Sequence, residues 1–325
     1  MNKPKPSRIF LIALALAVFG STVVAEETTE SQYIEFEPVP GLSGPLTSVG
    51  SDTLENLTLL WADRFKAHYP DIDMDIQATG SSTAPPALLS NSAMLAPMSR
   101  LMTDTEVAAF EQMHGYKPTP IIVAIDALAV YVHKDNPIEG LTFAEVDALF
   151  SINRACGAPV SIDSWSQLLA EAQWRNEDVL LYGRNLISGT HVYFRQHALC
   201  GGEFKPTVNE KPGSASVVQA VGAARNSIGY SGIGYSSAQV RAVPLARAAG
   251  KKFVEASADS ALAGSYPLAR LLYIYINKAP DQELELITAQ FIALALSGQG
   301  QRIVSRAGFI PLPARVAQRE IRKIK

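Results

Sequence analysis

The chain has 325 residues, of which 47% are hydrophobic and 18% charged, with 22 Gly, 20 Pro and 2 Cys. This composition excludes a disordered chain, a collagen-like chain and a small disulfide-framework protein, and the length favours two lobes of roughly 150 residues each. The formal net charge of −3 weighs against a general nucleic-acid binder, which carries a basic surplus to neutralise phosphates.

The N-terminus has the three parts of a secretory signal peptide. Lys3, Lys5 and Arg8 precede an apolar run over residues 9–19, and small residues lead up to Ala25 before acidic residues begin. We predict export and cleavage after Ala25, so that residues 1–25 are the signal peptide. The alternative, a membrane anchor, is disfavoured because a span needs roughly 20 apolar residues. Cleavage leaves 25 basic against 31 acidic residues, so the exported chain is the more acidic one.

The next part of the chain predicts an α/β architecture. Residues 26–45 are acidic and interrupted by Pro and Gly, which is typical of a flexible segment, and folding is expected to begin near Leu46. From there apolar strand patterns alternate with helical ones, as in a mostly parallel sheet flanked by helices. The expected elements are a strand over 46–49, a helix over 54–68, a strand over 71–78 and a helix that opens at 87–89.

Two long apolar runs lie at residues 121–132 and 266–277. The first is too long for a typical strand, and an extended segment that passes from one sheet to another would explain it. Two such crossovers predict a hinge and a cleft between lobes, with 46–125 and 266–325 in lobe 1 and 126–265 in lobe 2. The alternative is two core strands of one large sheet. The last strongly apolar helix is expected over 283–296.

The chain has two cysteines, Cys156 and Cys200. In an oxidising compartment such a pair indicates a disulfide first and two buried thiols second. There is no Cys-x-x-Cys, and the five His show no ligand spacing, so the sequence predicts neither a metal site nor a redox site.

Three expected helices begin with hydroxyl-bearing residues at the end of a strand. Such helix starts offer O–H donors and free backbone N–H groups at the positive end of the helix dipole. Each alone is an ordinary N-cap, but three together, one with an arginine, suggest convergence on a small oxyanion. The helix starts are Ser51-Asp52-Thr53, Gly80-Ser81-Ser82-Thr83, and Arg184 with Ser188-Gly189-Thr190.

Enzyme interpretations are weak. The chain has no Gly-x-Ser-x-Gly nucleophile motif and no Walker Gly-Lys-Ser/Thr, and the Asp/His clusters of metal phosphatases are missing from the sequence. We therefore expect a protein that is not an enzyme and needs no cofactor.

Nine short motifs together carry a family resemblance, which covers essentially the whole mature chain. They lie at residues 50–53, 80–88, 98–100, 126–130, 133–137, 182–185, 188–190, 228–235 and 266–270. The chain resembles the phosphate-binding proteins of the high-affinity phosphate ABC transporter, within the type II periplasmic binding-protein superfamily.

The resemblance implies a two-lobed fold with two hinge crossovers that closes on inorganic phosphate. It further implies a periplasmic location, delivery to an inner-membrane ABC permease, a monomer and no nucleic-acid partner. The ligand contacts that it implies fall on Thr53, Leu54 (through its N–H), Ser81, Arg184, Ser188, Gly189 and Thr190.

The chain also departs from this family. Known members carry an Asp near the position of Ser99, which accepts a proton from phosphate and rejects sulfate, and an acid at the position of Leu186. Asp52 or Asp126 could replace the missing acceptor, whereas Arg100 could add charge or pair with an acid away from the ligand. The further candidates for ligand binding or proton acceptance are therefore Ser51, Asp52, Ser82, Ser99, Arg100 and Asp126.

Three alternatives to phosphate delivery stay open. The first is a receptor for another oxyanion, such as sulfate or molybdate. The second is a phosphate-binding protein that serves signalling, secretion or adhesion without transport, and the most remote is a phosphate-ester hydrolase.

Overall fold

The computed structural model of the chain describes residues 32–324, which form one compact unit. The predicted signal peptide lies outside the described residues. Residues 32–43 contain no helix or strand, yet they are tied to the C-terminal part of the chain: the N–H of Gly298 donates to the carbonyl of Ile34 at 3.1 Å, and the Tyr33 hydroxyl donates to the carbonyl of Leu312. None of the helices in the described part is long and apolar enough to cross a bilayer.

The first folded segment follows the predicted order. Strand β1 (Gly44–Val49) pairs in parallel with β2 (Ile72–Gln77), and α1 (Glu55–His68) connects them. The expected helix opening at 87–89 is wrong, because α2 (Ala84–Leu89) ends there. Its two prolines stand in the first turn, where proline's fixed φ suits a helix and its missing N–H costs no hydrogen bond.

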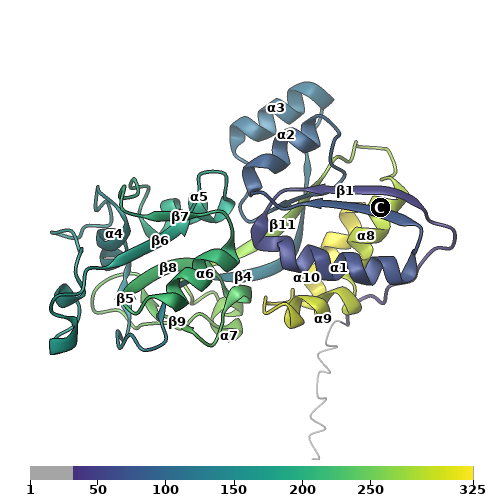
Figure 1. The fold of residues 1–325 in the computed structure, drawn as a ribbon. Helices are drawn as coiled ribbons and strands as arrows, with labels where there is room; N and C mark the ends of the chain where they lie inside the picture. Colours follow the sequence, from purple (N-terminus) through teal and green to yellow (C-terminus); the bar gives the residue numbers. More distant parts are fainter. Residues whose placement is uncertain (1–31, 325) are drawn as a thin grey trace, which may run out of the picture. The chain divides into compact units, whose positions relative to one another are not determined.

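Strand β4 (Thr119–His133) runs through the centre of the main sheet (Figure 1). Its residues 119–127 pair antiparallel with β11 (Ala269–Ile276), and its residues 128–133 pair with β8 (Ser227–Gly232) and β9 (Val240–Ala242). The long apolar run is thus one strand that changes partners along its length. The sheet order is β3 (Ala96–Met98), β11, β4, β8, β6 (Leu180–Arg184) and β7 (Asn209–Lys211), and a separate pair joins β5 (Leu141–Thr142) to β10 (Leu245–Ala246).

The α/β class is confirmed, and the sheet is mixed. The pairs of β6 with β7 and β8 are parallel, as predicted, whereas β4 and β11 make antiparallel pairs with each other and with their neighbours. The remaining helices are α3 (Asp104–His114), α4 (Phe143–Phe150), α5 (Gly189–Ala198), α6 (Ser214–Ala223), α7 (Ala258–Leu262), α8 (Leu286–Leu296), α9 (Gly298–Arg306) and α10 (Ala314–Ile321).

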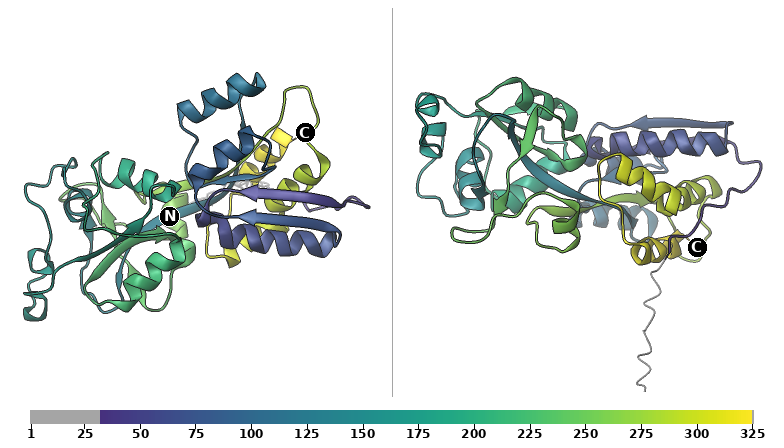
Figure 2. Two further views of the ribbon diagram at one scale, coloured as in Figure 1. Left: turned by 45° about the horizontal axis from the view of Figure 1, so that its top comes forward. Right: turned by 90° about the horizontal axis from the view of Figure 1, so that it is seen from below.

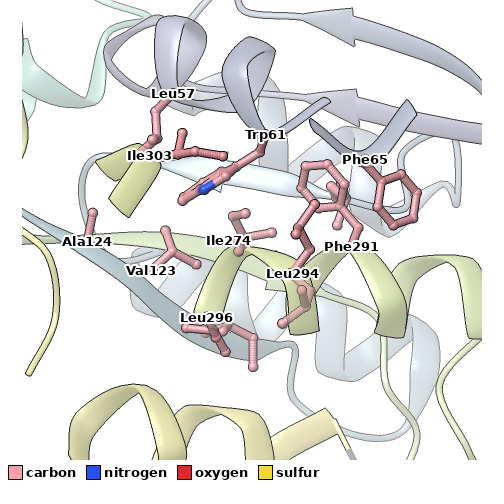
Figure 3. Packing of buried hydrophobic residues seen from close by; sticks show 14 of the residues in the cluster. Leu57, Trp61, Phe65, Val123, Ala124, Ile274, Phe291, Leu294, Leu296 and Ile303 are labelled. Atoms are coloured by element: carbon pink, nitrogen blue, oxygen red, sulfur yellow. The ribbon is translucent and has the colours of Figure 1, made fainter. Parts of the chain in front are cut away.

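The first hydrophobic core joins both ends of the folded chain. Trp61 and Phe65 of α1 pack near Phe291 of α8 and Ile274 of β11 (Figure 3). The rings of Phe65 and Phe291 lie edge to face with centroids 5.3 Å apart, and the Trp61 indole donates to the carbonyl of Gly300 at 3.1 Å. Figure 2 shows the yellow C-terminal helices beside the purple α1, as the contacts of α1 with α8 and α9 require.

The second core is built from the middle of the chain. Its residues from β4 begin at Ala127, while the first core takes residues of β4 up to Ala124. The rings of Phe194 and Tyr230 stack here with centroids 3.9 Å apart. The lobe boundaries 46–125, 126–265 and 266–325 stay a prediction, with which this change of core along β4 agrees.

The predicted disulfide is confirmed. Cys156 and Cys200 are bonded, with their Cα atoms 5.4 Å apart and a sequence separation of 44 residues. The bridge links the loop after α4 to the residue beyond Leu199, the C-cap of α5, so it closes the part of the chain that includes β6 and the whole of α5.

Candidate functional site

Four buried hydroxyl side chains meet where separate segments of the chain approach each other. We call Thr53, Ser81, Ser99 and Thr190 the hydroxyl cluster; all four are fully buried. The Oγ1 atoms of Thr53 and Thr190 are 2.8 Å apart, the Oγ atoms of Ser81 and Ser99 are 3.2 Å apart, and Ser99 Oγ lies 3.5 Å from Thr190 Oγ1. Segments more than 130 residues apart in the sequence therefore present donors to one place.

The first turn of α5 positions one side of this cluster. Ser188 is the N-cap, and its Oγ accepts from the backbone N–H groups of Thr190 at 3.2 Å and His191 at 3.4 Å. A Cβ on Gly189 would lie 2.3 Å from Ser81 Oγ, so only glycine allows this approach. The predicted Ser188-Gly189-Thr190 motif thus lies against Ser81, as convergence requires.

Arg184 ends β6, and both terminal nitrogens of its guanidinium group donate hydrogen bonds. Its Nη2 donates to Asp52 Oδ1 at 2.5 Å and to the carbonyl of Pro212 at 2.9 Å, and its Nη1 donates to Ser214 Oγ at 2.9 Å. Asp52 Oδ2 also accepts from the Ser214 N–H at 2.7 Å. Both charged side chains are almost entirely buried, so each compensates the other's loss of water. The Nε atom of Arg184 is buried without a hydrogen-bond partner among residues 32–324.

Two aromatic side chains hold the backbone of Arg184. The His191 Nδ1–H donates to its carbonyl at 2.9 Å, and its N–H donates to the Tyr230 hydroxyl at 3.1 Å. Burial lowers the pKa of His191, and burial raises the pKa of Tyr230. Both side chains are therefore neutral near pH 7, which suits them to fix the backbone without adding charge.

A second buried arginine, Arg270 of β11, was not among the predicted site residues. Its Nε and Nη2 donate to Asp126 Oδ2 at 2.9 and 2.8 Å, its Nη2 also donates to Thr190 Oγ1 at 2.9 Å, and its Nη1 donates to the carbonyl of Ser99 at 3.2 Å. Asp126 lies opposite Arg270 in the β4–β11 pairing, and its Oδ1 accepts from the Ile233 N–H at 3.0 Å. Arg270 is the last residue of the Tyr-Pro-Leu-Ala-Arg motif at 266–270, but nothing in the local sequence pattern connects this arginine to Thr190.

Two other predicted candidates, Arg100 and Ser82, contact each other. Arg100 makes a two-pronged ion pair with Glu106, with both N–O distances 2.7 Å, and also donates to Ser82 Oγ at 3.3 Å. Burial acts to raise the pKa of Glu106, but the hydrogen bonds from Arg100 and Thr103 outweigh it and lower the pKa. Of the two roles considered for Arg100, the structure shows pairing with an acid, Glu106.

Two further candidates make backbone or no contacts. The Leu54 N–H donates to the carbonyl of Ser51 at 3.3 Å, and the Ser51 Oγ is buried without a partner in the described part of the chain. Leu186, where the family resemblance predicts an acid, is 72% exposed.

A cavity of about 400 Å³ adjoins the hydroxyl cluster. Ser99 and Arg270 line it together with Tyr193, Tyr273 and Met102. Residues 32–324 contain no group of three or more His, Cys, Asp or Glu side chains that could hold a metal ion. Hydroxyl donors, backbone N–H groups and two arginines paired with carboxylates are the chemistry of oxyanion recognition.

Comparison with known proteins agrees with this chemistry. A family model described as PBP superfamily domain matches residues 23–299. The phosphate-binding protein PstS of Pseudomonas aeruginosa PAO1 is 53% identical over 290 residues, which are 89% of this chain and 90% of that protein.

Solved structures agree with the fold. A Clostridium perfringens protein with bound phosphate has a TM-score of 0.69 and 23% identity, over 83% of this chain and 100% of that one. An ABC-type phosphate transport receptor from Vibrio cholerae has a TM-score of 0.62 and 21% identity, over 82% and 100% of the two chains. With a family model matched over most of its length and a relative at 53% identity, the chain belongs to the PBP superfamily and, within it, to the PstS family of phosphate-binding proteins.

Proposed function

We propose that this protein is a substrate-binding protein that captures inorganic phosphate at the hydroxyl cluster and delivers it to an ABC permease of the inner membrane. The observation that carries the proposal is the convergence of four buried hydroxyls, the first turn of α5 and two buried arginines. A multivalent anion loses much solvation on burial, and a dense set of donors of this kind offsets that loss. The relatives named as phosphate-binding proteins support the same ligand.

The ligand contacts that we propose are those of the sequence motifs. Hydroxyls and N–H groups would bind the phosphate oxygens, with Arg184 supplying positive charge close by. The proposed contact residues are Thr53, Leu54, Ser81, Arg184, Ser188, Gly189 and Thr190.

The cellular setting follows from the same proposal. Cleavage of the signal peptide after Ala25 would place the protein in the periplasm as a monomer, where closure on the ligand is the signal that the permease recognises. A role as an enzyme is not proposed, because the site supplies donors for binding and its arginines are already paired with carboxylates.

A competition titration tests the ligand. The purified protein, refolded to remove any ligand that co-purifies, should bind phosphate and arsenate tightly and bind sulfate and molybdate far more weakly, as followed by calorimetry. Displacement of phosphate by equimolar sulfate or molybdate would assign the protein to another oxyanion. Turnover of a phosphate ester without added metal would instead favour a hydrolase.

Asp52 is the better of the two candidates for the acceptor of the phosphate proton. Among residues 32–324 the Asp126 carboxylate accepts hydrogen bonds from Arg270 and from the Ile233 N–H, and Arg270 lies between Asp126 and Thr190. Asp52 directly precedes Thr53, and each of its carboxylate oxygens accepts one hydrogen bond, which leaves a lone pair on each. We therefore assign Asp126 to Arg270 and Asp52 to the ligand.

The variant Asp52→Asn tests this assignment. Phosphate carries an O–H that needs an acceptor, whereas sulfate has none, so the loss of the carboxylate should reduce the preference for phosphate over sulfate by about tenfold or more. Calorimetric titration with both anions measures the ratio. An unchanged ratio in a folded Asp52→Asn protein would remove Asp52 from the ligand contacts.

A further inference from the structure

The C-terminal helices carry a charge opposite to that of the rest of the folded chain. Residues 298–325 contain 7 basic side chains and 1 acidic side chain, a formal charge of +6, whereas residues 32–297 contain 18 basic and 27 acidic ones, a formal charge of −9. Such an asymmetry along one chain indicates a surface that meets a partner of the opposite sign.

Helices α9 and α10 expose these cations on one side and bury apolar side chains on the other. Within α9, and within α10 together with the turn Arg322–Ile324 that follows it, the exposed arginines recur every three or four residues and so form one stripe on each helix. We call these five residues the basic face: Arg302, Arg306, Arg315, Arg319 and Arg322. The opposite sides pack into the first core through Ile303, Val304, Ala317, Ile321 and Ile324.

Residues 32–34 lie across both helices and connect the two stripes. The N–H of Gly298 at the start of α9 donates to the carbonyl of Ile34 at 3.1 Å, and the side-chain amide of Gln318 in α10 donates to the carbonyl of Gln32 at 2.5 Å. The two helices are therefore neighbours along one short segment of chain.

The contacts of this segment fall on the sides of the helices that carry the arginines. Gln318 stands three residues after Arg315 and four before Arg322, so all three share one side of α10 and its following turn. Gly298 stands one turn before Arg302, and Arg302 Nη1 lies 3.4 Å from where a Cβ on Gly298 would be. The two stripes thus border the same segment and form one surface.

The single acid among residues 298–324 does not neutralise this surface. Glu320 is fully buried, and its carboxylate accepts from the Ile122 N–H of β4 at 3.0 Å. It pairs with Arg319 at 3.2 Å and with the half-buried Lys323 at 2.5 Å. Lys323 thus accounts for most of its charge, and the exposed side of α10 presents cations.

Three arginines of the basic face make no ion pair with any acid of residues 32–324: Arg306, Arg315 and Arg322. Arg302 has an acid nearby, because Glu35 Oε1 also lies 3.4 Å from the position of a Cβ on Gly298. The unpaired positive charge is therefore concentrated on α10 and at the end of α9.

Arginine is suited to a surface made of phosphate groups, because a guanidinium can bind two phosphate oxygens at once. A layer of anionic phospholipids presents such groups over a wide area, and each basic side chain near it favours binding by a factor of about five. Nucleic acids also present phosphates, but the acidic charge of residues 32–297 and the predicted export of the chain disfavour them.

The acidic remainder of the molecule does not prevent this contact. Screening limits the reach of a surface charge to about 10 Å at 0.1 M salt, and a chain of this length has a radius of gyration of about 19 Å. Most acids on other sides of the molecule are therefore screened from a surface that α9 and α10 touch, and they favour the orientation in which these helices face the anions.

We propose that the basic face binds the anionic phospholipid surface of the membrane that holds the permease of the proposed function. The contact is electrostatic and reversible, because the apolar sides of both helices are already buried in the first core. It goes beyond phosphate capture, since it would concentrate the receptor beside the permease without using the hydroxyl cluster.

Cosedimentation with lipid vesicles tests the proposal. The mature chain that begins at Glu26 is used, so that the apolar run at 9–19 cannot contribute to binding. At about 0.1 M salt it should sediment with vesicles of phosphatidylglycerol and phosphatidylethanolamine but not with vesicles of phosphatidylcholine, and about 1 M salt should release it.

Two charge-matched double variants locate the contact. Arg315→Gln/Arg322→Gln should weaken binding to the anionic vesicles about thirtyfold, a factor of about five for each arginine. Lys251→Gln/Lys252→Gln removes the same charge from two exposed residues of the loop after β10 and should bind as the wild type does. Both variants should keep the wild-type phosphate affinity and unfolding midpoint, which shows that they are folded.

Several results would overturn the proposal. They are equal binding of the wild type to both kinds of vesicle, no binding to the anionic vesicles, and equal losses in the two double variants. A dimer in sedimentation equilibrium that Arg315→Gln/Arg322→Gln abolishes, without vesicle binding, would assign the basic face to a second copy, and a preference for duplex DNA over vesicles would assign it to nucleic acid. A wild type that binds anionic vesicles but not phosphate would overturn the proposed function and leave this inference standing.

Discussion

Replacing Arg184 with alanine should weaken phosphate binding about a thousandfold or more, because the change removes the buried guanidinium next to the hydroxyl cluster. The same change leaves the Asp52 carboxylate buried without its cation, since among residues 32–324 only the Ser214 N–H still donates to it. The free energy of unfolding should therefore fall as well, by about 3 kcal/mol, the size expected when one partner of a buried ion pair is removed. Calorimetry and thermal unfolding measure the two effects separately.

A charge-balanced variant separates binding from stability. Arg184→Met/Asp52→Asn leaves neither charge unpaired, so it should recover most of the lost stability while phosphate affinity stays low. Arg241→Met serves as the control for the loss of an arginine, because Arg241 donates to the backbone carbonyls of Asn136 and Ile138. Unchanged phosphate affinity in Arg184→Ala would show that this arginine is not part of the ligand site.

Removing the disulfide should have the largest effect on stability alone. The bond between Cys156 and Cys200 closes a loop with a sequence separation of 44 residues, for which the chain-entropy model gives about 4 kcal/mol. Cys156→Ser/Cys200→Ser should lower the midpoint of thermal unfolding by about 6 °C, given the usual unfolding entropy of a chain of this length. Phosphate affinity at low temperature should change little, because neither sulfur contacts the hydroxyl cluster.

Reduction of the wild-type protein provides the matching test without mutation. The reduced chain should unfold at the temperature of the double Ser variant, and the double variant should not respond to reductant. A midpoint that reductant leaves unchanged would show that the bridge contributes no net stability, as happens when strain in the folded state offsets the entropy term.

Sequence patterns predicted those parts of the site whose signals are local. Three hydroxyl residues of the cluster, Thr53, Ser81 and Thr190, and the glycine of α5 stand at helix starts, where cap preferences and turn chemistry make them visible. The long run at 121–132 exceeded the usual strand length, and this excess predicted a segment that passes from one sheet to another. In the structure β4 stays in one sheet and changes its strand partners along its length. The predicted start of α2 at residue 87 was wrong, since the helix begins at Ala84 and its first turn accommodates both prolines.

Contacts between distant segments could not be predicted in the same way. Arg184 and Asp52 are separated by 132 residues, and Arg270 and Thr190 by 80, so no local pattern records that they meet. Arg270 also lies at the start of an apolar strand, where a single arginine is usually an exposed residue at a strand end. The antiparallel register of β4 and β11 brings it opposite Asp126 and buries it.

The division of the two cores along β4 has a consequence for the order of assembly. The second core draws on residues 127–268 and, from the far end of the chain, only Ile310, so most of it can form once that stretch is available. The first core needs residues 46–124 together with residues 272–324. Helix α1 therefore cannot pack against α8 before the C-terminal part of the chain is present. Contacts of such long sequence separation form slowly. The N-terminal half of this core therefore stays exposed until the end of the chain is available to pack against it, an interval in which the incomplete core is prone to aggregation.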